Sequence, residues 1–176
     1  MLEELGEEPT TRLLSLFSCP RNPDVENFLK QKSIAFEKTH NARTRLILDE
    51  QGSILAYFSV SFKELVLESA ALNKSQVKRL DGFNKNAERI RAFLIGQLGK
   101  NFSVQNNLIT LTDILAEIYS IINDARELVG GRVIILECEN SPALIQLYRD
   151  HGFTLIETTD DNKTELRTMY IHIANQ

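Results

Sequence analysis

The 176-residue sequence holds only two cysteines, Cys19 and Cys138, and no tryptophan. Two cysteines cannot form the disulfide framework of a small secreted protein, and the sequence has no Cys-x-x-Cys pair that would bind zinc. The three histidines, His40, His151 and His172, are isolated from one another and lack the spacing of metal ligands. The sequence therefore predicts neither a disulfide scaffold nor a metal centre.

Long apolar runs are also missing. No stretch approaches the roughly 20 apolar residues that a membrane-spanning helix needs. The sequence begins with Leu2 and the acidic residues Glu3 and Glu4 rather than with a basic region followed by an apolar one, so no secretory signal is visible. We therefore expect a cytoplasmic protein.

Positive charge is not in excess either, because the net charge is −4 and the pI is near 5.5. Nucleic-acid binding depends on a basic surface, so this balance argues against it for the chain as a whole. A local basic group is present at Lys74, Lys78 and Arg79, and we interpret it as a solvated helix face. The hydrophobic share of 43% and charged share of 25% are those of one globular domain, residues 1–176, with residues 1–10 as a mobile acidic lead-in.

In the first half, "LLSLF" at 13–17 is predicted as a short strand or the end of a helix. A helix should begin at Asn22, which can cap it, with Pro23 in its first turn. Residues 44–67 have the pattern of a β-hairpin around a turn at 49–52. The polar residues 69–89 are predicted as a short helix and a loop.

In the second half, a strand over 90–98 is followed by a helix over 111–128 and a continuous apolar strand over 132–138. Thr110 to Asp113 fits a capping box before that helix. Such a strand–helix–strand unit predicts two parallel neighbouring strands. A helix capped by Ser141 and ending at Gly152 should come next, followed by strands over 153–158 and 166–173 joined by the turn "DDNK".

This order resembles the GNAT acyltransferase superfamily, from about Asp24 to Ile173. Three stretches carry the resemblance: "ARTRLILDEQGSILAYFSVS", "FLIGQLGKN" and "VGGRVIILECENSPALIQLYRDHGF". They look like the second and third strands of the family, its fourth strand, and its fifth strand with the helix that follows. The resemblance implies an α/β (α+β) three-layer GNAT fold, whose mixed, mostly antiparallel sheet contains a splayed parallel pair of strands. The hairpin sequence also resembles a subgroup that includes toxin acetyltransferases of bacterial toxin–antitoxin pairs, which acetylate aminoacyl-tRNA.

One motif of the family is absent. Relatives carry a glycine-rich turn that cradles the pyrophosphate of coenzyme A, whereas the matching residues here, 106–111, contain no glycine. Backbone N–H groups at a helix N-terminus bind anions whatever the side chain. Asparagine tolerates left-handed backbone conformations, so Asn106 and Asn107 can shape the turn, while Leu108 and Leu111 are bulky enough to crowd the phosphates.

The resemblance implies a site for acetyl-CoA. The pantetheine arm would pair with backbone groups of Gln97, Leu98 and Gly99, like an added strand. The backbone N–H near Leu98 would polarise the thioester carbonyl. The residues expected to hold the remainder of the cofactor are Asn106, Asn107, Leu108, Ile109, Thr110, Leu111, Thr112, Asn140 and Ser141. Gly96 and Gly99 have a second interpretation, a strand bulge without a ligand.

Tyr148 lies four residues before Gly152, as the family's tyrosine commonly does. The resemblance makes it the general acid that protonates the departing thiolate, since a phenol and an alkyl thiol have similar proton affinities. From periodicity alone, it would be a tyrosine packed on a helix face. No general base stands out, because Glu64, Glu68, Glu137 and Glu139 are interpreted as surface carboxylates.

Three functions stay open. The first is an N-acetyltransferase acting on the primary amine of a small molecule or peptide. The second is a toxin of a toxin–antitoxin pair that acetylates aminoacyl-tRNA, against which the acidic pI counts. The third is a degenerate, non-catalytic GNAT binding module, suggested by the missing glycines. A homodimer is compatible with each of them.

Overall fold

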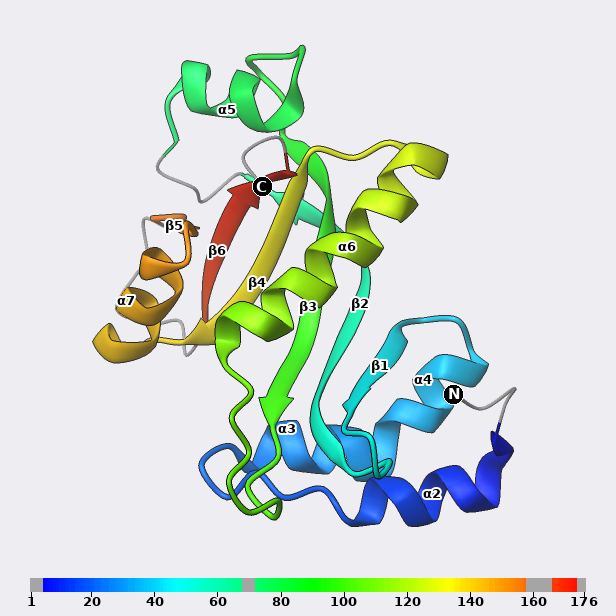
Figure 1. Cartoon of the computed structure of the whole chain (residues 1–176). Helices are drawn as coiled ribbons and strands as arrows, with labels where there is room; N and C mark the ends of the chain where they lie inside the picture. The colour runs from blue at the N-terminus through cyan, green and yellow to red at the C-terminus, as the bar shows by residue number, and fades with distance from the viewer. Residues whose placement is uncertain (1–4, 68–71, 158–165, 174–176) are drawn as a thin grey trace. The chain divides into compact units, whose positions relative to one another are not determined.

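The structure is a computed structural model that describes residues 5–67, 72–157 and 166–173. Six strands are hydrogen-bonded in the order β1-β2-β3-β4-β6-β5 (Figure 1). Among the described residues the sheet is mixed, with β3 and β4 as its parallel pair. The mixed sheet with a parallel pair, expected from the resemblance, is therefore confirmed. The strands span Arg43–Leu48, Ile54–Val66, Arg89–Lys100, Val133–Glu139, Thr154–Leu155 and Leu166–His172, from β1 to β6.

The chain falls into two compact units. The first comprises residues 1–61 and 96–118, and the second comprises residues 62–95 and 119–176. Strands β2 and β3 and helix α6 (Leu111–Val129) each contribute residues to both units. The single domain expected from composition stays a prediction, and each unit is described by itself below.

The first unit begins with helix α2 (Glu7–Ser15), where a mobile lead-in was expected. Thr10 is fully buried and donates from Oγ1 to the carbonyl oxygen of Gly6 at 2.6 Å. Leu14 is also buried, so this helix packs through Thr10 and Leu14. The acidic residues at the start of the chain had suggested a mobile segment instead. "LLSLF" ends this helix, which was one of its two predicted interpretations, and residues 1–4 lie outside the described residues.

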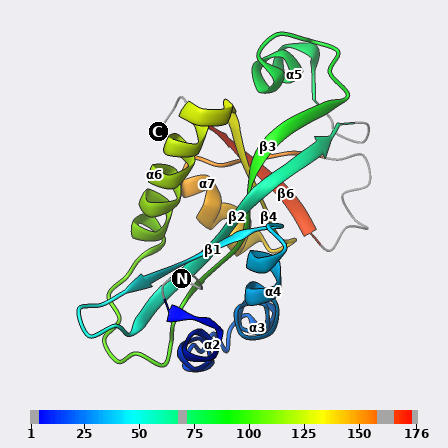
Figure 2. The same ribbon diagram turned by 90° about the vertical axis from the view of Figure 1, so that its right-hand side faces the viewer.

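The helix expected after Asn22 begins there. Oδ1 of Asn22 accepts from the backbone N–H of Val25 at 3.2 Å, and proline occupies the first turn. The helical run is divided into α3 (Pro23–Asn27), a π-helical turn η1 (Phe28–Lys32) and α4 (Ser33–Lys38). Helices α2 and α3 are seen close to end-on in Figure 2. Helix α2 contacts the π-helical turn η1. Val25 and Leu29 are buried on the inner face.

The predicted hairpin is confirmed. Strands β1 and β2 pair antiparallel from Arg43↔Val60 to Leu48↔Ile54. The turn is held by Asp49, whose Oδ1 accepts from the backbone N–H groups of Gln51 at 3.0 Å and Ser53 at 2.7 Å. The left-handed backbone of this turn is at Gly52, with φ +81°, where glycine avoids steric strain.

The second unit contains the predicted parallel pair of strands. Strands β3 and β4 pair in parallel at Phe93↔Ile134, Leu94↔Ile135 and Ile95↔Leu136. All four residues of β4 from Val133 to Leu136 are buried, as the continuous apolar pattern predicted for a strand covered on both faces. Strand β6 pairs antiparallel with β4 over its whole length and also with β5. The predicted turn at 160–163 lies outside the described residues.

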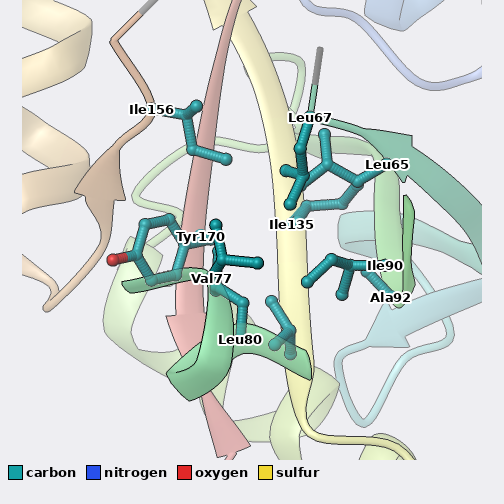
Figure 3. Packing of buried hydrophobic residues seen from close by; sticks show 10 residues of the cluster. Leu65, Leu67, Val77, Leu80, Ile90, Ala92, Ile135, Ile156 and Tyr170 are labelled. Atoms are coloured by element: carbon teal, nitrogen blue, oxygen red, sulfur yellow. The ribbon is translucent and has the colours of Figure 1, made fainter. Parts of the chain in front are cut away.

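One apolar cluster of the second unit joins strands to helix α5 (Lys74–Asp81) (Figure 3). Val77 and Leu80 of α5 pack against β-strand residues that include Ile90 and Ile135. Asn73 and Gln76 form a capping box at the start of α5. The short helix predicted in this polar region therefore forms, although residues 68–71 lie outside the described residues.

Helix α6 follows its predicted bounds, but its last turn is not buried. Ile114, Leu115, Ile118 and Ile122 are buried, whereas Leu128 in the last turn is 86% exposed. Helix α7 (Pro142–Asp150) completes the second unit. Within the described ranges, no helix is both long and apolar enough to cross a bilayer.

Candidate active site

The end of β3 carries two of the sequence-predicted glycines, in the first unit. A Cβ built on Gly96 would lie 3.1 Å from Oγ of Ser59. A Cβ on Gly99 would lie 2.5 Å from Cγ1 of Val25 and 3.3 Å from Cζ of Phe17. Gly99 therefore permits the close approach of α3 to the strand, which is a packing role that neither interpretation of the sequence included.

Gln97 and Leu98 stand between these glycines and are half-buried. The parallel register of β3 with β4 ends at Ile95 and Leu136, although β4 continues to Glu139. Strand β6 pairs with the other edge of β4 over residues 133–139. The splaying of β3 from β4 that the GNAT resemblance implies stays a prediction.

The loop after β3 is fixed by two asparagine side chains. Nδ2 of Asn101 donates to the carbonyl oxygen of Ile54 at 2.7 Å, and Oδ1 of Asn101 accepts from the backbone N–H of Ser18 at 2.9 Å. Nδ2 of Asn107 donates to the carbonyl oxygens of Leu55 at 2.8 Å and Asn101 at 2.9 Å. The loop is thus anchored to β2 without glycine.

The conformation of the loop agrees with part of the expectation. Asn106 has φ +53°, the left-handed conformation predicted for it. Asn107 contributes through its side chain instead, since its Oδ1 accepts from the backbone N–H of Ile109 at 3.1 Å. Leu108 is 86% exposed, and its side chain therefore does not fill the interior of the loop. The binding of a diphosphate by this loop stays a prediction.

The start of α6 has the predicted capping box. Oδ2 of Asp113 accepts from the backbone N–H of Thr110 at 2.7 Å and from its Oγ1 at 2.6 Å. These hydrogen bonds hold the pKa of the Asp113 carboxyl below its usual range. Leu111 is half-buried, and Thr112 is exposed on the first turn.

A lysine lies beside this loop, and the sequence interpretation missed it. Nζ of Lys100 donates to the carbonyl oxygen of Ile109 at 2.9 Å, at the residue before Thr110. Among the described residues, Lys100 has no carboxylate partner. Only its place directly after "IGQLG" could have suggested it, and that signal is weak.

Tyr148 lies near the end of α7, in the second unit. Its carbonyl oxygen accepts from the backbone N–H groups of His151 at 3.1 Å and Phe153 at 3.0 Å, which ends the helix. The Tyr148 ring meets the Phe153 ring edge-on, with centroids 5.9 Å apart. Gly152, with φ +87°, makes the reversal that brings Phe153 back against the tyrosine. The spacing of the Tyr-x-x-x-Gly-Phe sequence is explained by this turn.

The Tyr148 hydroxyl has no hydrogen-bond partner among the described residues. Burial, with a smaller contribution from Cys138, raises the pKa of Tyr148 to about 12. The phenol is therefore protonated at neutral pH and can donate. Its pKa is further from that of a thiol, about 8.5, than the sequence interpretation assumed. Tyr148 is consequently better suited to donate a hydrogen bond to a thiolate than to pass its proton completely.

Asn140 and Ser141 lie just before α7. Oδ1 of Asn140 accepts from Nη1 of Arg167 at 3.4 Å. Ser141 occupies the N-cap position, but its side chain makes no capping hydrogen bond, so the predicted cap is wrong in that respect. Pro142 in the first turn lacks an N–H, and the backbone of Ser141 bonds back to Glu139 at 2.7 Å.

The carboxylates considered as general bases are held in surface ion pairs where the structure describes their partners. Glu137 lies 2.6 Å from Nζ of Lys63, and Glu64 lies 3.0 Å from Nη1 of Arg89. Glu68 lies outside the described residues. The first unit holds Gln97, Leu98, Gly99 and the loop residues 106–112, and the second unit holds Tyr148, Asn140 and Ser141.

Neither protein-family models nor curated proteins match this chain in a comparison with known sequences. Solved structures do match in fold. The chain superposes on AtaT complexed with acetyl-methionyl-tRNAfMet with a TM-score of 0.70 and 16% identity, covering 92% of this chain and 88% of that chain.

Two further solved structures also match the fold of this chain. A mutant of KacT, in which a phenylalanine replaces a tyrosine, gives a TM-score of 0.70 at 15% identity, with 92% of this chain and 88% of that chain covered. A structure described as a bacterial toxin gives 0.69 at 16% identity, covering 90% and 82%. The predicted resemblance is confirmed at the level of the fold: the chain has the GNAT-type acyltransferase fold, in the form seen in the toxins AtaT and KacT.

Proposed function

We propose that the protein is an acetyltransferase that moves the acetyl group of acetyl-CoA to the amine of an aminoacyl-tRNA. The observation that carries this proposal is the shared fold, over 92% of the chain, with AtaT solved together with acetyl-methionyl-tRNAfMet. Related AtaT structures contain acetyl-CoA or the C-terminus of the antitoxin AtaR. We extend the donor and acceptor seen there to this chain as a proposal.

The donor end of the proposed site is built from the first unit. Backbone N–H groups at the start of α6 provide partial positive charge for a diphosphate. Lys100 adds a full positive charge beside the loop, 2.9 Å from the carbonyl oxygen of Ile109. Together they replace the glycine-rich turn that the loop lacks. The backbone of Gln97, Leu98 and Gly99 would pair with the pantetheine arm.

Acetyl-CoA, when bound, supplies a thioester carbonyl and a thiolate leaving group. The backbone N–H near Leu98 would donate to the carbonyl oxygen and stabilise the negative charge that develops as the neutral amine attacks. The Tyr148 hydroxyl, protonated and without a partner among the described residues, would donate to the sulfur as the carbon–sulfur bond breaks. The proton lost by the amine goes to solvent, since no carboxylate stands out as a base.

A local charge imbalance favours tRNA over a small amine as acceptor. Residues 62–95 contain seven Lys or Arg and four Asp or Glu, a net charge of +3 in a chain whose total is −4. Lys74, Lys78 and Arg79 of α5 are exposed, and none has an ion-pair partner among the described residues. Unpaired cations on one helix suit a phosphate backbone. This local positive charge weakens the argument against tRNA that the acidic pI of the whole chain provided.

The proposal is tested with the full chain, radiolabelled acetyl-CoA and three acceptors: methionyl-tRNA, deacylated tRNA and methioninamide. We expect label in methionyl-tRNA, none in deacylated tRNA, which lacks the amine, and little in methioninamide, which lacks the tRNA. Equal rates with methioninamide would favour a small-molecule acceptor instead. Calorimetric titration with acetyl-CoA separates the degenerate alternative, which predicts no heat at about millimolar cofactor.

A further inference from the structure

The second unit contains a pocket that none of the predicted site residues lines. Its volume is about 430 Å³. Three short stretches form it: residues 62–64 of β2, residues 91–93 of β3, and residues 129–131 at the end of α6. This volume lies within the roughly 300–1,000 Å³ of small-molecule sites.

The pocket has an aromatic wall. The rings of Phe62 and Phe93 lie 4.7 Å apart with their planes 38° from each other. Phe93 is buried, whereas Phe62 is 63% exposed. A large aromatic side chain that faces water beside a cavity gains stabilisation when a flat apolar group covers it.

Two glycines form the edge of the pocket that lies against the Phe93 ring. A Cβ built on Gly131 would lie 2.3 Å from Cε2 of Phe93, and its φ of +130° is a conformation that other residues rarely adopt. Gly130, with φ +74°, turns the chain just before it. The pair therefore lets the backbone pass over the Phe93 ring and leaves backbone rather than side chains along this edge.

One cation at the pocket is uncompensated. Successive strand residues alternate between faces, so Arg89, Arg91 and Phe93 lie on one face. Arg89 pairs with Glu64 at 3.0 Å. Arg91 is exposed and has no ion pair or hydrogen bond with any residue in the described ranges. An aromatic wall beside one free guanidinium selects a flat molecule with one negative group.

We propose that this pocket binds a planar aromatic anion, with its ring system against Phe62 and Phe93 and its carboxylate or sulfonate on Arg91. The volume suits one small molecule rather than a folded segment of a partner protein. The site is independent of the proposed acetyl transfer.

The test uses 1-anilinonaphthalene-8-sulfonate, a fluorescent aromatic anion, and its uncharged analogue N-phenyl-1-naphthylamine. We expect Arg91→Gln to weaken binding of the anion about tenfold, as loss of a charge-assisted hydrogen bond does, and to leave the uncharged analogue within about twofold. The matched control is Arg45→Gln, because Arg45 is exposed, has no ion-pair partner among the described residues and lies outside the pocket lining. Phe62→Ala should weaken both probes, whereas Phe83→Ala, 91% exposed and outside the pocket lining, should weaken neither.

Acetyl-CoA at saturation should not displace the anion, because none of the residues proposed to bind the cofactor lines this pocket. Amide chemical shifts of the wild-type protein provide a measurement that requires no variant: the largest shifts should fall on Phe93, Gly130 and Gly131. Equal affinity of Arg45→Gln and Arg91→Gln for the anion would overturn the proposal. Displacement by acetyl-CoA, or shifts centred elsewhere, would overturn it as well.

Discussion

Gly99 of β3 lies directly against Val25 of α3, so that a Cβ added to the glycine would lie 2.5 Å from Cγ1 of the valine. Tyr57 strengthens the same contact, because its hydroxyl donates to the carbonyl oxygen of Val25 at 2.6 Å. The absence of a side chain on Gly99 therefore leaves room for the helix beside the strand, and a buried hydrogen bond holds the helix there. Gly99, which the sequence analysis predicted to bind the cofactor, is therefore also needed for the packing of α3 against β3.

Gly99→Ala should consequently destabilise the protein by about 1–3 kcal/mol, the usual range for overpacking. Denaturant unfolding followed by circular dichroism measures the effect. The double variant Gly99→Ala/Val25→Ala should recover part of the loss, because the smaller side chain makes room for the new methyl group. Additive losses in this double-mutant cycle would show that the two residues are not coupled.

Tyr148→Phe should lower the rate of acetyl transfer by about 10²-fold, since it removes the hydrogen-bond donor proposed for the leaving thiolate. Single-turnover kinetics measures this, and calorimetry should give an unchanged Kd for acetyl-CoA. Tyr119→Phe is the matched control: the Tyr119 hydroxyl is buried without a partner among the described residues, so its removal should leave the rate unchanged. An unaltered rate in Tyr148→Phe would remove Tyr148 from the mechanism.

Lys100→Gln should weaken acetyl-CoA binding about tenfold, because a charged hydrogen-bond donor contributes about 1.5–3 kcal/mol. The wild-type Kd should also rise with salt more steeply than that of the variant. Lys32→Gln, an exposed lysine at the end of η1, controls for the change of net charge. The same Kd for wild type and Lys100→Gln would show that the lysine only supports the loop.

Asn106→Gly should be neutral or slightly stabilising, whereas Asn106→Val should cost about 1–2 kcal/mol. The reason is the φ of +53°, which glycine adopts freely and a β-branched residue resists. Thermal unfolding of the two variants gives the comparison. If valine were tolerated as well as glycine, the loop would not need its left-handed residue.

Stability should fall on acidification because of His172. This histidine is 9% exposed, and its Nε2 has no partner among the described residues. Burial, followed by the charges of Arg79 and Arg132, lowers the pKa of His172 below its usual value. The unfolded chain therefore binds the proton more readily, so the stabilisation is present above about pH 6.5 and is lost as the pH falls.

The measurement for His172 is the free energy of unfolding at about pH 7.5 and about pH 5. The wild type should lose more stability between these values than His172→Asn does. A variant whose pH dependence equals that of the wild type would show that other groups govern the acid response.

The boundaries of most elements could be predicted because local chemistry sets them. Asn22 and Pro23 begin a helix, Thr110 and Asp113 cap another, and Asp49 closes the hairpin turn with its own carboxylate. Each of these signals acts over three or four residues. The strand–helix–strand order predicted the parallel pair of strands, and the resemblance to GNAT proteins added the mixed sheet around it; the structure contains both.

Contacts between distant residues were decided only by the tertiary structure. The approach of Val25 to Gly99, the position of Lys100 beside Ile109, and the pocket around Phe62 and Arg91 depend on how the chain folds back on itself. The first turns of helix α2 also escaped prediction, because they are acidic and only packing reveals the buried Thr10. The sequence by itself determined where the strands and helices form, since capping, turns and hydrophobic periodicity are local, whereas burial and charge compensation depend on neighbours that only folding brings together.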